Sequence, residues 1–157
     1  MTEPHESALS ESQRWLRWAR EDLTLAQHAL ADREVVRRGA CTWAHQAAEK
    51  AVKALLVSAG TDPPKIHDLS RLARLTDDPA RARLTTLELV EVTRWAIEGR
   101  YPSDVEDASA SDAEAAVRIA EQFVGVAGAV LRGEGEPHGP PSTSDDLDGH
   151  AVEPGGT

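Results

Sequence analysis

An alanine-rich stretch, residues 41–60, constrains the fold more than any other part of this sequence. Five alanines and no proline lie between Ala44 and Leu56, a composition that favours a helix. Two neighbouring stripes of mostly small or apolar side chains follow this helix. The first comprises Cys41, His45, Ala48, Val52, Leu55 and Ala59, and the second comprises Ala44, Ala47, Ala51 and Ala54. Because two such stripes require neighbours on two sides, we expect this helix to be the centre of a bundle.

The remaining helices are predicted from apolar spacing and from their end signals. With the central one, the expected helices span residues 11–32, 35–59, 69–75, 79–98 and 112–132. Trp15 and Trp18 flank the apolar stripe of the first helix and are expected to widen its buried face. No alternating strand pattern is present. The sequence therefore predicts an all-α, up-and-down bundle of four long helices plus one short helix.

Helix starts carry recognisable capping residues. The expected caps are a capping box at Ser10 and Gln13, another at Ser111 and Glu114, an N-cap at Asp68, and an N-cap at Asp78 followed by Pro79 in the first helical position. Gly60 is expected to end the central helix in a left-handed conformation, with Pro63 and Pro64 after it.

Charge divides the chain into three parts. Eight of the 27 acidic side chains lie in residues 1–10 and 133–157, which contain no Lys or Arg, so residues 11–132 keep 19 acidic against 17 basic side chains. We therefore predict a flexible N-terminus (1–10), a helical bundle (11–132) and a disordered acidic tail (133–157). The nearly neutral bundle gives no reason to expect broad binding to nucleic acid.

Several classes of protein are disfavoured by what the sequence lacks. No apolar run has the length of a membrane span, and residues 1–10 do not have the pattern of a secretory signal. A single Cys fits a reducing compartment, so we expect a cytoplasmic protein. The His and Cys residues lack the spacing of a zinc site, and there is no glycine-rich phosphate loop. No metal and no cofactor are expected.

The first candidate for chemistry is Arg94. It shares one face of its predicted helix with Leu87, Val90 and Ile97, so it occupies a position where an aliphatic residue is expected. A guanidinium there must be paired or must open onto a cleft, because burying it alone is very costly. Two interpretations stay open: an arginine that pairs with an acid on another helix, and an arginine that binds a ligand.

Further candidates follow the helices. Arg100 and Tyr101 come just after a helix end, where an arginine could hold a phosphate and a tyrosine could stack on a base, although a plain surface turn explains them as well. His67 lies in a turn between helices and could act as an acid or base, or simply bind a helix end. His45 is expected to be a core histidine with its hydrogen bonds satisfied.

The edge of the central helix carries Glu49, Lys50 and Lys53. We expect this edge to be exposed, with Glu49 and Lys53 forming a favourable pair one helical turn apart.

Taken in order, these pieces resemble the HEPN domain family, the higher eukaryote and prokaryote nucleotide-binding domains. The resemblance rests on Gln46-Ala-Ala-Glu-Lys-Ala-Val-Lys53, then Gly60, then His67-Asp-Leu69, and later Arg100-Tyr-Pro102. It covers roughly residues 15–131. It implies a bundle of four or five helices that commonly dimerises. Many relatives are ribonucleases of toxin–antitoxin or defence systems, and others are paired with a minimal nucleotidyltransferase.

In the ribonuclease branch of that family, an Arg is followed after four to six residues by a His, and a dimer joins two such motifs in one cleft. Arg94 matches the Arg, but Arg100 stands where the His is expected. Arg cannot take part in proton transfer, because it does not give up its proton. This departure argues against RNA cleavage.

Three functions therefore stay open. The first is a nucleotide- or RNA-phosphate-binding homodimer, partnered by a minimal nucleotidyltransferase, with its site among Arg94, Arg100, Tyr101, His67, Asp68, Lys50 and Lys53. The second is a metal-independent ribonuclease toxin that works through Arg94 and His67. The third is a purely structural dimer without a ligand.

Overall fold

In the computed structural model, residues 9–84, 89–98 and 107–133 are described. They form only helices and their connections. Three helices are long, α1 (Glu11–Ala31), α2 (Arg37–Ser58) and α6 (Ala110–Leu131), and three are shorter, α3 (Leu69–Arg74), α4 (Asp78–Leu84) and α5 (Leu89–Glu98). The predicted all-α bundle is confirmed. None of the described helices combines the length and apolar character that a membrane span requires.

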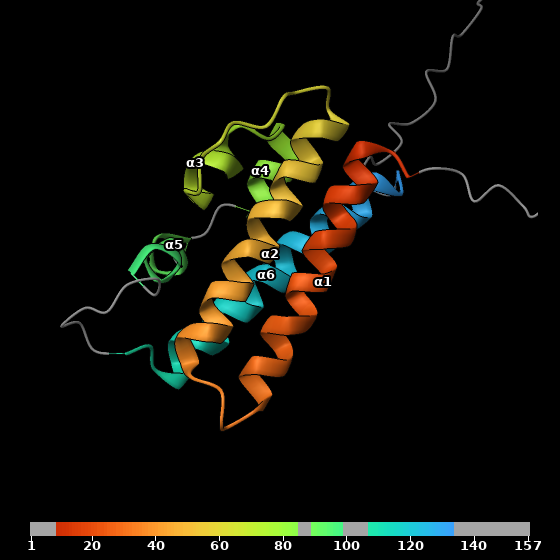
Figure 1. Cartoon of the computed structure of the whole chain (residues 1–157). Coiled ribbons are helices and arrows are strands. Elements are labelled where there is room, and N and C mark those ends of the chain that lie inside the picture. Colours follow the sequence, from red (N-terminus) through yellow and green to blue (C-terminus); the bar gives the residue numbers. More distant parts are fainter. Residues whose placement is uncertain (1–8, 85–88, 99–106, 134–157) are drawn as a thin grey trace, which may run out of the picture.

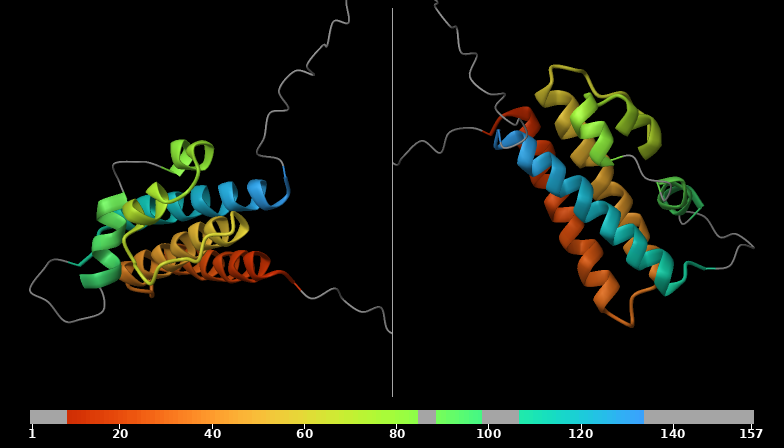
Figure 2. Two further views of the ribbon diagram at one scale, coloured as in Figure 1. Left: turned by 90° about the horizontal axis from the view of Figure 1, so that it is seen from above. Right: turned by 180° about the vertical axis from the view of Figure 1, so that it is seen from behind.

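The three long helices lie side by side (Figure 1). α1 and α2 form an antiparallel hairpin, and α6 packs along both of them in the same general direction as α2. The shorter α3, α4 and α5 pack against α2 and α6, on the side that faces away from α1 (Figure 2). Because α2 contacts α1, α3, α5 and α6, it is the central helix, as the sequence predicts.

Close packing around α2 follows from its two stripes. The small side chains Ala44, Ala47, Ala51 and Ala54 are all fully buried, as are Cys41, Ala48 and Val52 of the first stripe. Alanine allows neighbouring backbones to approach closely, and the larger residues of other helices fill the space that remains. Among these, Phe123 of α6 and Leu69 and Leu72 of α3 are fully buried.

Three predicted helix ends are confirmed. At the start of α1, the Ser10 hydroxyl accepts from the backbone N–H of Gln13, and the Gln13 side chain accepts from the N–H of Ser10. Asp68 caps α3 by accepting from the N–H of Arg71 at 3.1 Å. Gly60 follows α2 with φ of 77°, a conformation that most residues with a Cβ avoid.

Two predicted caps are wrong by one or two residues. The capping box of α6 joins Ser109 to Asp112, rather than Ser111 to Glu114, so the helix begins at Ala110. At the start of α4, the Asp77 carboxylate accepts from the N–H of Ala80 at 3.1 Å, so the cap is Asp77 and not Asp78. In both places the sequence offers two polar residues close together. Capping by the earlier residue makes the helix longer, so more backbone groups form helical hydrogen bonds.

The single helix expected over residues 79–98 is observed as two segments, α4 and α5, on either side of residues 85–88, which lie outside the described part. The two segments run in clearly different directions, since α5 is viewed end-on where α4 is not (Figure 1). Trp18 also differs from the prediction, since it is 57% exposed. It therefore does not widen the buried face of α1.

Some predictions fall on residues that the structure does not describe. These are the flexible N-terminus over residues 1–8, the acidic tail from residue 134 onward, Leu87, Arg100 and Tyr101.

Candidate functional site

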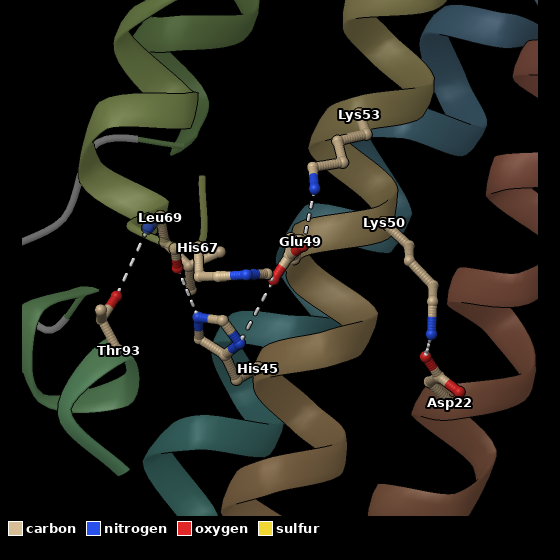
Figure 3. A network of polar contacts seen from close by, with 8 residues as sticks. All are labelled: Asp22, His45, Glu49, Lys50, Lys53, His67, Leu69 and Thr93. Carbon is tan, nitrogen blue, oxygen red and sulfur yellow. Dashed lines mark hydrogen bonds and ion pairs between the residues drawn. The ribbon is translucent and has the colours of Figure 1, made fainter. Parts of the chain in front are cut away.

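A polar cluster joins the middle of α2 to the segment that leads into α3 (Figure 3). Its central group is the Glu49 carboxylate, whose side chain is only 14% exposed. Lys53 donates a hydrogen bond from Nζ to Glu49 Oε1 at 2.7 Å, and His67 donates from Nδ1 to Glu49 Oε2 at 3.0 Å. Glu49 and Lys53 are one helical turn apart, so the predicted pair is confirmed. The partner His67 comes from 18 residues along the chain.

His45 fixes the same segment through its backbone. The His45 Nε2 atom lies 2.8 Å from the carbonyl oxygen of His67. A carbonyl only accepts, so Nε2 of His45 carries the proton and donates. His45 is almost completely buried, which confirms it as a core histidine with a hydrogen-bond partner. It lies one turn before Glu49, with its Nδ1 atom 3.8 Å from Glu49 Oε2.

Electrostatics keeps Glu49 ionised. Burial alone would raise the pKa of its carboxyl, but the hydrogen bonds from Lys53 and His67 and the positive charge of Lys53 outweigh this and lower the pKa below its usual value. The carboxylate therefore offers two acceptor oxygens near neutral pH, and both have donors.

The expectation of an exposed edge on α2 is wrong. The Lys53 side chain is 10% exposed, and its Nζ atom lies 5.8 Å from the ring centre of Trp15. Lys50 is also largely buried and pairs with Asp22 of α1. The reason is that α1 covers this side of α2, so the long stems of both lysines pack between helices while each amine meets a carboxylate.

Arg94 lies in a different setting, on the outer face of α5. It does share a face with Val90 and Ile97, but the expectation that this face is the buried one is wrong: Val90 is 65% exposed and Ile97 is 59% exposed. On α5, the side chains of Leu89, Val92 and Trp95 are buried instead. The helix is therefore rotated relative to the prediction, and its apolar residues cover both faces.

The Arg94 side chain is 40% exposed. Its Nη1 atom lies 3.3 Å from Glu91 Oε2 on the same helix, and its guanidinium carbon lies 4.8 Å from the ring centre of Trp95. We call Val90, Arg94 and Ile97 the outer face of α5.

The start of α3, which follows the polar cluster in the chain, contacts α5. The backbone N–H of Leu69 donates to the Thr93 hydroxyl at 3.4 Å (Figure 3). Leu69 lies two residues after His67, and Thr93 lies immediately before Arg94. A ribonuclease that uses both His67 and Arg94 requires this segment to approach the helix of Arg94, and it does so here.

The other candidates have structural roles or lie outside the described residues. Asp68 caps α3, and the amines of Lys50 and Lys53 are held by carboxylates. Burial, with Asp112 nearby, raises the pKa of the Cys41 thiol to about 11, so it is not a nucleophile near neutral pH. Among the described residues, no group of three His, Cys, Asp or Glu side chains could hold a metal ion.

Sequence reasoning missed the central position of Glu49. The sequence does place His45, Glu49 and Lys53 in one row at intervals of four, and this row is the signal that could have found it. What it could not show is that the row faces His67.

These features define an all-α domain in which a largely buried polar cluster anchors the segment before α3 and a partly exposed arginine lies on a neighbouring helix. The chain belongs to the HEPN domain family, since the sequence profile of that domain matches residues 12–130. This confirms the resemblance that the motifs indicate. No protein with a curated functional description matches the sequence significantly.

Two solved structures share the fold. The crystal structure of TT1696 from Thermus thermophilus is 23% identical, with a TM-score of 0.62, over 76% of this chain and 98% of that chain. The crystal structure of ST0689, an archaeal HEPN homologue, is 24% identical, with a TM-score of 0.61, over 78% of this chain and 99% of that chain. At this level of identity the likeness establishes the architecture alone.

Proposed function

We propose that this HEPN-domain protein is a homodimeric module that binds the phosphate of a nucleotide or of RNA through Arg94. The observation that carries the proposal is the setting of Arg94, which is partly exposed between two exposed aliphatic side chains on the outer face of α5. An arginine that served only the core would lie on the face with Leu89, Val92 and Trp95.

The neighbours of Arg94 suit it to phosphate. The Trp95 ring lies within cation–π distance of the guanidinium, and a phosphate binds such a group through its N–H donors. The ion pair with Glu91 is exposed, and such pairs contribute at most about 1 kcal/mol. A phosphate brings more charge and a matching bidentate geometry, so it can replace the Glu91 carboxylate.

The outer face of α5 also supports the homodimer. Val90 and Ile97 flank Arg94 at one helical turn on either side and expose apolar surface that a second copy would cover. Two copies joined there would bring two Arg94 side chains together. Their like charges repel unless an anion lies between them, so a bound phosphate stabilises the dimer and completes the site.

Family resemblance adds a protein partner to this proposal. Some HEPN proteins are paired with a minimal nucleotidyltransferase, and such a partner, with the toxin–antitoxin role, is part of the same proposal. Arg100 and Tyr101, which lie outside the described residues, stay predicted members of the site.

The proposal is tested by the affinity for a fluorescent single-stranded RNA, measured by anisotropy for the wild type, Arg94→Ala and Arg17→Ala. Arg17 is the matched control, because it also lies on a helix surface and pairs with an acid on its own helix, Glu21, at 3.1 Å. Loss of one phosphate contact should weaken binding at least about tenfold in Arg94→Ala, whereas Arg17→Ala should bind like the wild type.

If the two variants bind alike, Arg94 is not a phosphate ligand. If in addition the wild type is a dimer that binds no RNA or nucleotide, the structural-dimer alternative holds instead.

A second candidate function, metal-independent RNA cleavage, is favoured by His67. Its side chain is 60% exposed, and Glu49 holds its Nδ1 atom, so Nε2 could take the proton of a ribose 2′-hydroxyl. Cleavage by the purified wild type in a chelator, lost in both His67→Ala and Arg94→Ala, is the expected result for this function. No cleavage by the wild type leaves the binding module.

A further inference from the structure

We infer that His67 is the residue that selects ribose over deoxyribose, by accepting a hydrogen bond at Nε2 from a 2′-hydroxyl of the strand whose phosphate Arg94 holds. This inference rests on the proposed function, because it requires that a nucleic acid strand binds beside α5. It names the atom by which the site would distinguish RNA from DNA.

The first step is the proton position on His67. A carboxylate only accepts hydrogen bonds, so the 3.0 Å contact between His67 Nδ1 and Glu49 Oε2 places the proton on Nδ1. In the neutral ring the other nitrogen, Nε2, then carries a lone pair and is an acceptor. Lys53 binds the second oxygen of Glu49 and so keeps the carboxylate turned toward His67.

The second step is the position of that acceptor. The His67 side chain is 60% exposed although its Nδ1 atom is bound to a nearly buried carboxylate, so we expect the exposed part of the ring to be the edge that carries Nε2. The surrounding polar groups are already engaged: His45 donates to the His67 carbonyl, and Asp68 caps α3. The ring is therefore held in place before a ligand arrives, which lowers the entropy cost of binding.

The third step is the neighbourhood of Arg94. The Leu69–Thr93 hydrogen bond fastens the His67 segment to α5 next to Arg94. A nucleic acid strand presents a phosphate at every nucleotide, and an RNA strand also presents a 2′-hydroxyl at every nucleotide. A short strand can thus meet a donor of phosphate contacts on α5 and an acceptor on the adjoining segment. The 2′-hydroxyl is the donor that distinguishes RNA from DNA.

The test compares the binding of an RNA and a DNA oligonucleotide of the same sequence by fluorescence anisotropy. The proteins compared are the wild type and the variants His67→Ala, His67→Asn and Arg94→Ala. The wild type should bind RNA up to about tenfold more tightly than DNA, the ratio expected from one net hydrogen bond. His67→Ala should remove this preference by weakening RNA binding while DNA binding stays unchanged.

His67→Asn is the decisive variant. Asparagine keeps an amide N–H at the position of Nδ1 that can donate to Glu49, but it has no acceptor where Nε2 lies. The segment should therefore stay in place, as judged by an unchanged melting temperature, while the RNA preference is lost. A preference that survives in His67→Asn, or equal affinity of the wild type for RNA and DNA, overturns the inference.

Glu49→Gln and the Arg94 variant separate this inference from the proposed function. Nitrogen-15 NMR of the histidine rings should show neutral His67 protonated at Nδ1 in the wild type, with a mixture of the two ring forms in Glu49→Gln. Protonation of wild-type His67 at Nε2 overturns the inference even if RNA binds. If neither RNA nor DNA binds in an Arg94-dependent way, the proposed function fails, and the inference fails with it.

Discussion

Two regions of this domain carry its candidate residues, and they differ in how those residues are held. In the cluster of α2 and the segment before α3, Glu49 has donors on both oxygens, from Lys53 and His67, and lies almost out of solvent. On the outer face of α5, Arg94 lies among exposed side chains and pairs with Glu91 beside it on the same helix. The first region is fixed by contacts between distant parts of the chain, whereas the contacts of Arg94 with Glu91 and Trp95 lie within one helix.

The difference matters because the same kind of ion pair has different worth in the two places. An exposed pair is screened by water, whereas a nearly buried pair leaves an uncompensated charge when one partner is removed. We therefore expect the cluster to govern stability and the orientation of His67, and the outer face of α5 to govern association. The following predictions test that division.

The largest effect is expected for Glu49→Ala. It leaves the Lys53 amine almost buried without its carboxylate, so the free energy of unfolding should fall by about 3 kcal/mol. The matched control is Glu21→Ala, which removes a carboxylate that is also paired one turn away but is well exposed, and which should cost less than about 0.5 kcal/mol. Urea unfolding measures both. Equal losses would show that the burial of the Glu49–Lys53 pair adds nothing to its contribution.

The second effect compares two valines of α5. Val92 is buried and Val90 is exposed, so Val92→Ala should lower the free energy of unfolding by about 2 kcal/mol, and Val90→Ala by less than about 0.5 kcal/mol. Both are measured in dilute protein, where association is absent. A larger loss of stability for Val90→Ala than for Val92→Ala would instead support the orientation of α5 that the sequence alone predicts, with Arg94 on the buried face.

A smaller effect is expected from pH. Because the pKa of Glu49 is lowered in the folded state, its contribution to stability is complete above its unfolded pKa, about 4.3, and is lost as the pH falls through the folded value. The stability difference between the wild type and Glu49→Gln should thus shrink on acidification below about pH 4. A difference that grows on acidification below about pH 4 would contradict the lowered pKa.

The smallest change in stability, with the largest change in assembly, is expected for Ile97→Asp. Ile97 is exposed, so the free energy of unfolding of the monomer should change by less than about 0.5 kcal/mol. If the outer face of α5 forms the proposed dimer interface, a charge at Ile97 should shift the protein to monomers in sedimentation velocity. Trp18→Asp, on the exposed side of α1, is the control and should leave the dimer intact; the reverse result would move the dimer interface to α1.

Much of the fold could be predicted because it depends on residues close in sequence. The alanine stripes of α2, the cap at Ser10, the cap at Asp68 and the left-handed Gly60 all follow from local spacing or local backbone preference. The same kind of reasoning failed by one or two residues where two caps compete, as at Asp77 and Asp78.

The burial of the candidate residues could not be predicted in this way. Spacing grouped Val90, Arg94 and Ile97 correctly, but it gave no means to decide whether that group or Leu89, Val92 and Trp95 faces the bundle, since both groups are apolar. Lys50 and Lys53 look like exposed residues by type, and only the position of α1 over them explains their burial.

By itself, the sequence determined the helices, most of their ends and the HEPN family. The helices follow from apolar residues at intervals of three and four, their ends follow from capping residues a few positions apart, and the family follows from short motifs. Tertiary structure alone decided that Glu49 faces His67 and that Arg94 faces outward. Both depend on which helix covers which face, and that is set by the packing of the whole core rather than by any one segment.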